Sequence, residues 1–378
     1  MTKKIDGYFD YASATPCSES VLGVMKPFFI DEFYNPSALY SSSDKSKEAI
    51  KLARRTVAEH LGVRSSEVVF VSGCTEANNL AVHGIMEANP GGKIVISSIE
   101  HESVRQAVYQ HSYSEAPVSE NGIIDIDKLK ALITDDVVLV SIIYVNNEIG
   151  VVQPLRKVAR LIEKIKKSRG PNGRPLYLHT DAAQAPNVRS INRSALGVDL
   201  MSLNSAKVYG PKGSGCLYID SSVAISPIQN GGGQEFGLRS GTENTAGIVG
   251  FAHALDLVCK ARKQEADRLS LVQDHLESAV EALGCQVLAK KSDRSQAITS
   301  ILLPGIDSET AVYKLDKLGF SVSSGSACHA KSGEKSHVLT SLGLSDEEAM
   351  RVVRISMGHQ TTVESVDSLV RAIKQILA

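Results

Sequence analysis

Residues 68–76 read VVFVSGCTE, a short apolar run that reaches a glycine turn and passes into the helical pattern ANNLAVHGIME at residues 77–87. An apolar run of this length is typical of a buried strand, and Gly73 punctuates its end. The stretch therefore predicts one strand–turn–helix unit, the repeating element of an α/β fold.

The same unit recurs along the first two thirds of the chain. Apolar runs of strand length, separated by helix-like segments, begin at residues 93 (KIVISS), 137 (VVLVSIIYV), 176 (LYLHT) and 198 (VDLMSL). This alternation predicts a mainly parallel sheet with crossover helices, and the continuous apolarity predicts that both of its faces are covered. Ligands of such sheets bind at the carboxyl ends of the strands, so the residues that follow each run are candidates for a site.

The pattern changes near residue 250. A helical stretch with a charged middle runs from Ala246 to about Leu283 and predicts a long helix that connects two domains. Beyond it, strand-like and helix-like segments, among them a helix capped by Ser345 and Glu348, describe a compact α+β unit. We predict a large domain at residues 1–250 and a smaller C-terminal domain at residues 251–378. The first 15 to 20 residues are candidates to pack on the smaller domain.

Charge and hydropathy exclude several classes of function. The formal net charge of the 378 residues is -1, so nothing in it indicates binding to nucleic acid or to an anionic membrane. No apolar run approaches the roughly 20 residues needed to cross a bilayer, and the start MTKKIDGYFD has no signal-peptide core. We expect a cytoplasmic protein that acts on a small molecule.

The six cysteines form neither a CxxC motif nor any paired metal-ligand spacing. This argues against a zinc site and against a disulfide framework, so no metal site is predicted. Cys259 and Cys285 lie in apolar or junction sequence, where a free cysteine usually behaves as a small hydrophobe. Cys328, within SSGSACHAK at residues 323–331, has no such apolar surroundings.

Two of the predicted strands end in residues that could carry chemistry. Gly73, Cys74 and Thr75 open a helix whose free N–H groups could bind a phosphate, although an ordinary N-cap is an equal reading. Asp181 and Gln184 follow the strand LYLHT. A carboxylate there can pair with a protonated ring nitrogen, as a pyridoxal phosphate (PLP) site requires, or it can simply cap a helix.

A lysine and a glycine-rich loop follow further along. Lys207, in NSAKVYGPKGSG, comes after a predicted strand and could form a Schiff base with a carbonyl; a solvated loop lysine is the commoner case. The GPKGSG stretch lacks the order of an ATPase phosphate loop, because Lys212 is followed by glycine. The loop GGGQEFGLRSGTEN at residues 231–244 carries Arg239 and Thr242, and it either reaches a phosphate or forms a flexible surface turn.

Taken in order, these motifs resemble those of PLP-dependent cysteine desulfurases of aminotransferase class V, the fold-type I group. The resemblance runs almost end to end, through FDYASATP, YNPSALY, SGCTEANN, IEHES, VNNEIGVVQP, HTDAAQA, NSAKVYGPKG, GGGQEFGLRSGTEN, SSGSAC and VVRISMG. It implies a fold-type I large domain and a homodimer that converts L-cysteine to L-alanine. The sulfur would pass as a persulfide to an acceptor protein, either an iron–sulfur scaffold or a tRNA-thiolation enzyme.

The resemblance also implies a role for each matching residue. Lys207 would hold PLP as a Schiff base and move the substrate Cα proton, and Cys328 would take the sulfur. Asp181 would pair with the pyridine nitrogen, and His101 would stack on the ring. Gln184 and Asn147 would hydrogen-bond the O3′ oxygen of the ring. Arg354, helped by Asn35, would bind the substrate carboxylate, and Asn147 is also assigned to substrate binding. The phosphate would be held by Thr75, the backbone near Cys74, Ser205 and Thr242 of a partner subunit.

Two departures from the family pattern touch the cofactor pocket. Ala206 replaces the histidine that commonly precedes the Schiff-base lysine, so Asn204 or Ser205 must supply a phosphate contact. Ala38 and Tyr40 replace a serine and a histidine of another family motif. Two alternatives stay open: a related PLP lyase acting on selenocysteine or cysteine sulfinate, and a catalytically weak scaffold that keeps the fold.

Overall fold

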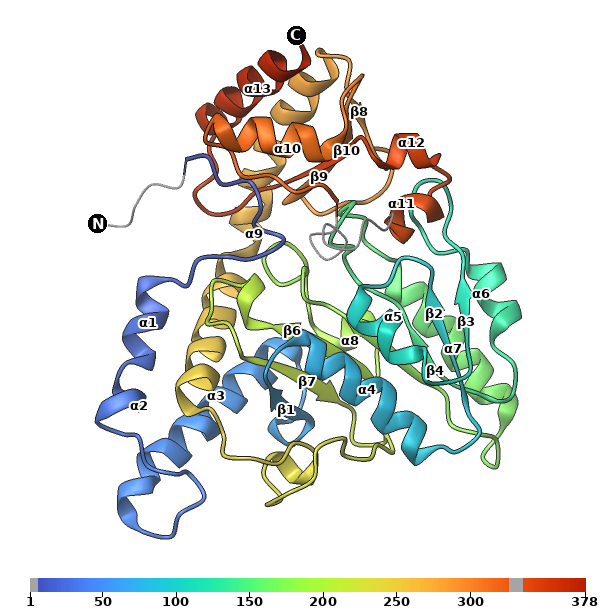
Figure 1. The fold of residues 1–378 in the computed structure, drawn as a ribbon. Helices are drawn as coiled ribbons and strands as arrows, with labels where there is room; N and C mark the ends of the chain where they lie inside the picture. Colours follow the sequence, from blue (N-terminus) through green and yellow to red (C-terminus); the bar gives the residue numbers. More distant parts are fainter. Residues whose placement is uncertain (1–5, 326–335) are drawn as a thin grey trace.

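The computed structural model describes residues 6–325 and 336–378, so that Cys328 lies outside the described residues (Figure 1). A seven-stranded sheet forms the centre of the large domain, in the order β1-β7-β6-β5-β4-β2-β3. Its strands are β1 (Val68–Val71), β2 (Lys93–Ser97), β3 (Tyr113–Ala116), β4 (Val137–Ser141), β5 (Tyr177–Asp181), β6 (Leu200–Asn204) and β7 (Gly215–Ile219).

Strands β3, β2, β4, β5 and β6 are parallel, and β7 is antiparallel to both of its neighbours, β6 and β1. The prediction of a mainly parallel α/β sheet is therefore confirmed. Strands β3 and β7 were not among the predicted runs. Strand β7 reads GCLYI and was apolar enough to be found, but it directly follows the glycine-rich turn that dominated that stretch.

Helices cover both faces of the sheet, which explains why its strands are apolar throughout. In β1, Val68 and Phe70 pack into the core that includes α3 and α9, whereas Val69 and Val71 pack into the core that includes α4 and α5. The helices of this domain are α1 (Glu19–Met25), α2 (Pro27–Ile30), α3 (Asp44–Leu61), α4 (Cys74–Ala88), α5 (Glu102–Val108), α6 (Ile126–Leu132), α7 (Leu155–Arg169), α8 (Arg193–Leu196) and the first half of α9 (Thr245–Glu281).

Helix α9 is 37 residues long, about 55 Å at the usual rise per residue, and runs from the large domain into the small one (Figure 1). The predicted connecting helix is thus present. Val258 still packs in the large-domain core, while Leu269 packs in the small-domain core. The charged stretch between them separates the two cores.

The small domain consists of a three-stranded sheet with helices around it. Its sheet order is β10-β9-β8, antiparallel throughout. Its elements after α9 are β8 (Gln286–Val287), β9 (Ile298–Leu302), α10 (Ser308–Lys317), α11 (His337–Ser341), α12 (Asp346–Ala349), β10 (Val352–Ser356) and α13 (Val363–Leu377).

The start of the described chain, residues 8–10, pairs with this small domain. Phe9 belongs to the small-domain core, Tyr8 bridges to Ser321, and Asp10 bridges to Ser356 of β10. Residues 8–10 thereby lie beside the strand that carries Arg354, and the chain then crosses to the large domain.

Within the described residues, no helix combines the length and apolarity needed to span a membrane. Among residues 6–325 and 336–378, no three or more His, Cys, Asp or Glu side chains are grouped so that they could hold a metal ion.

Candidate active site

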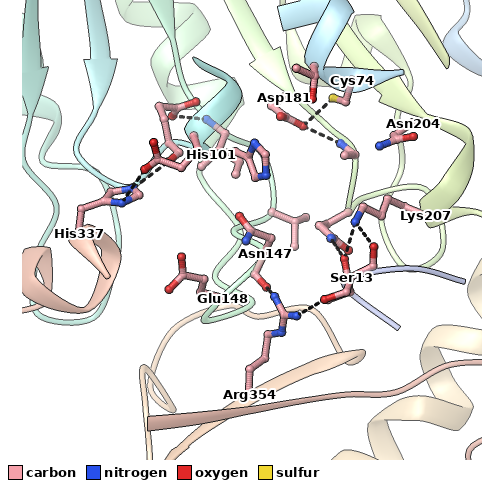
Figure 2. A pocket seen from close by; sticks show the side chains of 18 residues that line it. Ser13, Cys74, His101, Asn147, Glu148, Asp181, Asn204, Lys207, His337 and Arg354 are labelled. Atoms are coloured by element: carbon pink, nitrogen blue, oxygen red, sulfur yellow. Dashed lines mark hydrogen bonds and ion pairs between the residues drawn. The ribbon is translucent and has the colours of Figure 1, made fainter. Parts of the chain in front are cut away.

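A cavity of about 270 Å³ lies between the two domains, at the carboxyl edge of the large sheet (Figure 2). The ends of several parallel strands supply its wall, as expected for an open α/β sheet. The side chains that line it include Ser13, Cys74, Thr75, Glu100, His101, Asn147, Glu148, Asp181, Gln184, Asn204, Lys207, His337 and Arg354. Most of the residues predicted from the sequence therefore converge on one site.

Asp181 is the last residue of β5, and only 4% of it is exposed. Its Oδ1 atom accepts hydrogen bonds from the backbone N–H of Ala183 (3.0 Å) and from the Cys74 thiol (3.2 Å). Its Oδ2 atom accepts one from the Asn78 amide (2.8 Å). These three donors hold the carboxylate in one orientation at the base of the cavity.

Lys207 ends the short 3₁₀ helix Ser205–Lys207 that follows β6. Its Nζ atom donates to the backbone oxygens of Ala12 (2.8 Å) and Ser13 (2.5 Å) on the N-terminal segment. Burial, followed by the nearby Arg354 charge, lowers the pKa of this amine. A lowered pKa makes the neutral, nucleophilic form easier to reach, as a Schiff-base lysine requires.

Three further predicted residues line the same cavity. His101 is the N-cap of α5, and its Nδ1 atom accepts the backbone N–H of Ser103 (3.1 Å), which fixes the plane of the ring. Gln184 donates from Nε2 to the Ala12 oxygen (2.8 Å). Asn147 follows β4, and its backbone oxygen accepts a hydrogen bond from Arg354 (2.9 Å).

The N-terminus of α4 forms one end of the cavity. Gly73 adopts φ 148° and ψ −177°, a conformation that is essentially confined to glycine. The turn places Cys74 and Thr75 in the cavity lining. The first N–H groups of a helix have no partner within the helix itself. An anion at this end would meet those N–H groups and the positive end of the helix dipole.

The other predicted phosphate contacts lie elsewhere in this chain. Ser205 is fully buried, and its hydroxyl lies so close to Gly210 that an added Cβ there would collide with it. Ser205 therefore packs behind the cavity wall. Asn204 lines the cavity instead, which favours Asn204 of the two candidates. Thr242 lines a separate cavity of about 150 Å³. Its predicted role was in a partner subunit, and that role stays a prediction.

Arg354 reaches the cavity from β10 of the small domain (Figure 2). Only 3% of its side chain is exposed, and its Nη2 atom donates to Asp10 Oδ1 and to Ser13 Oγ, both at 2.7 Å. The guanidinium is therefore an ordered, partly neutralised cation. Asn35 is exposed and does not line this cavity, so the structure does not bring it to Arg354 within one chain.

The two departures from the family pattern occupy different surroundings. Ala206 accepts hydrogen bonds at its backbone oxygen from the N–H and hydroxyl of Thr15 and does not line the cavity. Tyr40 is 54% exposed and packs edge-on against Tyr34. Among the described residues, neither Ala206 nor Tyr40 supplies a hydrogen bond to the side chain of Lys207 or Asp181.

Sequence reasoning missed two buried acids of the cavity lining, Glu100 and Glu148. Glu100 is fully buried, and its Oε1 atom accepts from Ser97 Oγ (2.5 Å) and from the backbone N–H of Ile143 (2.6 Å). Its Oε2 atom has no hydrogen-bond partner among the described residues. Burial raises the pKa of this carboxyl to about 8. Glu100 stands next to His101 in the IEHES motif, where the family resemblance implies a role for the histidine alone.

The segment after the undescribed residues also contributes to the site. The Ser336 hydroxyl donates to Glu148 Oε2 (2.5 Å), and His337 Nε2 donates to the backbone oxygen of Glu100 (2.9 Å). Both contacts join the small domain to the large domain beside the cavity. The predicted nucleophile Cys328 lies outside the described residues, so its position relative to the cavity stays a prediction.

The residues present fit PLP. Lys207 offers an amine to an aldehyde, the buried Asp181 offers a carboxylate to a ring nitrogen, and the N-terminus of α4 offers N–H groups to a phosphate. His101 would lie against the ring. This donor set is selective, because it matches three chemically different parts of one cofactor.

Comparison with known proteins agrees with this chemistry. The aminotransferase class-V family profile matches residues 7–369. A cysteine desulfurase IscS from Clostridium botulinum is 37% identical over 100% of this chain and 95% of its own length. A cysteine desulfurase IscS 1 from Archaeoglobus fulgidus is 35% identical over 98% of this chain and 96% of its own length.

Solved structures show the same relationship. A NifS-like protein superposes with a TM-score of 0.91 at 30% identity, covering 98% of both chains. A structure described as SspA in complex with cysteine has a TM-score of 0.80 at 31% identity, covering 94% of this chain and all of that one. The chain belongs to aminotransferase class V and, within it, to the PLP-dependent cysteine desulfurases.

Proposed function

We propose that this enzyme converts L-cysteine to L-alanine and passes the sulfur through Cys328 to an acceptor protein. The observation that carries the proposal is the convergence of Lys207, Asp181 and Arg354 on one buried cavity. An amine, a carboxylate and a guanidinium in that arrangement suit an amino-acid substrate bound to a cofactor.

Bound PLP supplies an electron sink for the substrate's Cα. Lys207 would hold the cofactor through its amine and would move the Cα proton, for which its lowered pKa is suited. Asp181 would accept a hydrogen bond from the ring nitrogen, and His101 would pack against the ring. Asn147 and Gln184 would orient the cofactor through hydrogen bonds.

Arg354 receives the carboxylate of the substrate. Its Nε atom is buried and has no hydrogen-bond partner among the described residues, so a donor remains for a ligand. Asp10 already occupies Nη2, and an incoming carboxylate therefore shares the guanidinium with Asp10 or displaces it. The paired geometry keeps the guanidinium in place before substrate arrives.

The sulfur step balances with Cys328 as the nucleophile. The Cys328 thiolate attacks the substrate sulfur, an S–S bond forms, and the C–S bond breaks with its electron pair left on the carbon skeleton. That carbon takes a proton and leaves as L-alanine, while Cys328 holds the sulfur as a persulfide. A thiolate of the acceptor then attacks the outer sulfur of the persulfide. That sulfur moves to the acceptor as a new persulfide, and the Cys328 thiolate is released.

We further propose a cytoplasmic homodimer whose sulfur acceptor is an iron–sulfur scaffold or a tRNA-thiolation enzyme. Exposed apolar side chains on residues 29–40, among them Phe29, Ile30 and Phe33, support a subunit interface on the large domain. The placement of Thr242 outside its own chain's cavity also supports a contribution to a second subunit. Sedimentation of the purified protein tests the dimer.

The activity is tested on the purified, PLP-loaded protein with L-cysteine and a thiol reductant, by measuring alanine and sulfide. Lys207→Ala should abolish turnover and the Schiff-base absorbance, whereas the control Lys212→Ala should preserve both. Cys328→Ala should lose cysteine turnover. Full turnover by Lys207→Ala contradicts the proposal. Loss of cysteine turnover with selenocysteine turnover retained by Cys328→Ala would favour the alternative, a related PLP lyase, since selenium can leave without a nucleophilic cysteine.

A further inference from the structure

Cys74 is a buried thiol in direct contact with the predicted partner of the cofactor ring. It is the first residue of α4, 5% exposed, and its side chain lies beside Asp181 in the cavity wall (Figure 2). The Sγ atom stands 3.2 Å from Asp181 Oδ1, well inside the distance for a sulfur hydrogen bond. The role assigned to this position from the sequence concerned its backbone, so the thiol itself has no role yet.

The contact belongs to a complete set of donors around the carboxylate. Oδ1 accepts both the thiol and the Ala183 N–H, and Oδ2 accepts the Asn78 amide. Asn78 is itself fixed, because its amide also donates to Ser103 Oγ (2.7 Å). A ring N–H that binds Asp181 must therefore share the carboxylate with these donors.

The thiol can act only as a donor in this position. Burial, followed by the adjacent Asp181 charge, raises the pKa of Cys74 well above the usual value for a thiol. The proton therefore stays on sulfur near neutral pH, and Cys74 is unsuited to be a second sulfur nucleophile.

We propose that Cys74 is a positioning residue that acts through Asp181: its S–H bond aligns the carboxylate and weakens it as an acceptor for the protonated ring nitrogen of PLP. The inference rests on the proposed role of Asp181. A carboxylate that already accepts a hydrogen bond gives less electron density to the next donor. The thiol, a weak donor, makes this a moderate adjustment.

The hydrogen bond itself is tested by infrared spectroscopy of the S–H stretch in the holoenzyme. The difference spectrum of wild type minus Cys74→Ala should contain one band shifted to low frequency by the carboxylate. In an Asp181→Asn background the band should move to higher frequency, because an amide oxygen is a weaker acceptor. The matched control is Cys285→Ala, a buried cysteine of the small-domain core, whose difference band should not respond to Asp181→Asn.

The effect on the cofactor is tested by the ¹⁵N chemical shift of the ring nitrogen in protein loaded with labelled PLP. Cys74→Ala should move this shift further toward a fully protonated pyridine nitrogen. Cys74→Ser, which restores a donor at the same position, should move the chemical shift back toward the wild-type value. A purely structural cysteine would leave the shift unchanged.

The outcomes separate this inference from the proposed function. If Asp181→Asn leaves the ¹⁵N shift unchanged, Asp181 is not the ring partner, and the proposed function and the inference both lose that step. If Asp181→Asn changes the shift but Cys74→Ala does not, the cofactor role stands and the inference is overturned. The inference is also overturned if Asp181→Asn leaves the frequency of the Cys74 S–H band unchanged.

Discussion

The two walls of the cavity are built differently. The large-domain wall comes from the carboxyl ends of neighbouring strands: Asp181 is the last residue of β5, and Lys207 ends the short 3₁₀ helix that follows β6. The small-domain wall presents Arg354, whose partners come from the N-terminal segment and from the loop after β4. The large-domain wall follows from local strand order, whereas the other exists only after distant segments have packed together.

This difference suggests a division of labour. The large-domain wall holds the groups that face the cofactor, so substitution of these groups should lower kcat. The small-domain wall holds the group that faces the substrate carboxylate, Arg354, so substitution of Arg354 should raise KM. Three substitutions test whether the division holds, and a fourth tests the buried acid Glu100 of the large-domain wall.

The largest effect is expected from Asp181→Asn. The amide cannot stabilise a protonated ring nitrogen, so kcat for cysteine should fall by about 10²- to 10³-fold, with a smaller change in KM. Steady-state kinetics of the PLP-loaded variant measures both constants. A variant with normal kcat and raised KM would contradict the division between the walls.

Arg354→Lys should produce the opposite pattern. Lysine keeps the charge but loses the planar fork, which should raise KM about 10- to 100-fold and change kcat little. The same kinetic measurements decide the result, with circular dichroism to confirm that the buried position tolerates lysine. A fall in kcat at unchanged KM would show that Arg354 acts on the chemistry rather than on binding.

Asp10→Asn tests how far the small-domain wall is prepared before substrate arrives. Asparagine still accepts a hydrogen bond but no longer neutralises Arg354, so the free energy of unfolding should fall by about 2 to 3 kcal/mol. Because the guanidinium is then less neutralised, KM should fall a few-fold. Urea denaturation and kinetics measure the two effects, and a raised KM would mean that Asp10 mainly orients Arg354.

Glu100→Gln should change how the stability of the protein depends on pH. Burial raises the pKa of Glu100 to about 8 from an ordinary value of 4.5, so the folded protein retains a proton that the unfolded chain has released. The stability contributed by this group is present below about pH 4.5 and is lost as the pH rises towards 8.

The glutamine variant should therefore lose less stability than wild type on going from mildly acidic to mildly alkaline pH. The difference is at most about 1.4 kcal/mol per pH unit. Urea midpoints across the pH range measure it. Parallel pH profiles for the two proteins would show that Glu100 ionises normally in the folded state.

The sequence could predict much of the fold because its signals are local. A strand that is buried on both faces is apolar throughout, and each such run ends where a parallel sheet binds ligands. For that reason the sequence could predict the strands β1, β5 and β6 and the helix α9. It could also predict that Asp181 and Lys207 lie at the ends of strands. Strand β7 was missed because it follows a glycine-rich turn, and β3 because its polar sequence, YSEA, has no apolar run.

The rest of the site depended on contacts between segments that are far apart in the chain. Asp10 and Arg354 are separated by 344 positions, and no local pattern relates them. The thiol of Cys74 meets Asp181 only because β7 inserts between β1 and β6 and α4 packs over them. Glu100 is unusual through its burial, which its neighbours in sequence do not reveal.

The sequence by itself thus determined the α/β class, the strand ends that carry the chemistry, and the cofactor and reaction that the family resemblance implied. The tertiary structure decided which partners those groups have: the donors on Asp181, the counter-charge on Arg354 and the buried proton on Glu100. The physical reason is that secondary structure reflects short-range periodicity, whereas charge balance and pKa depend on distances and burial that only packing sets.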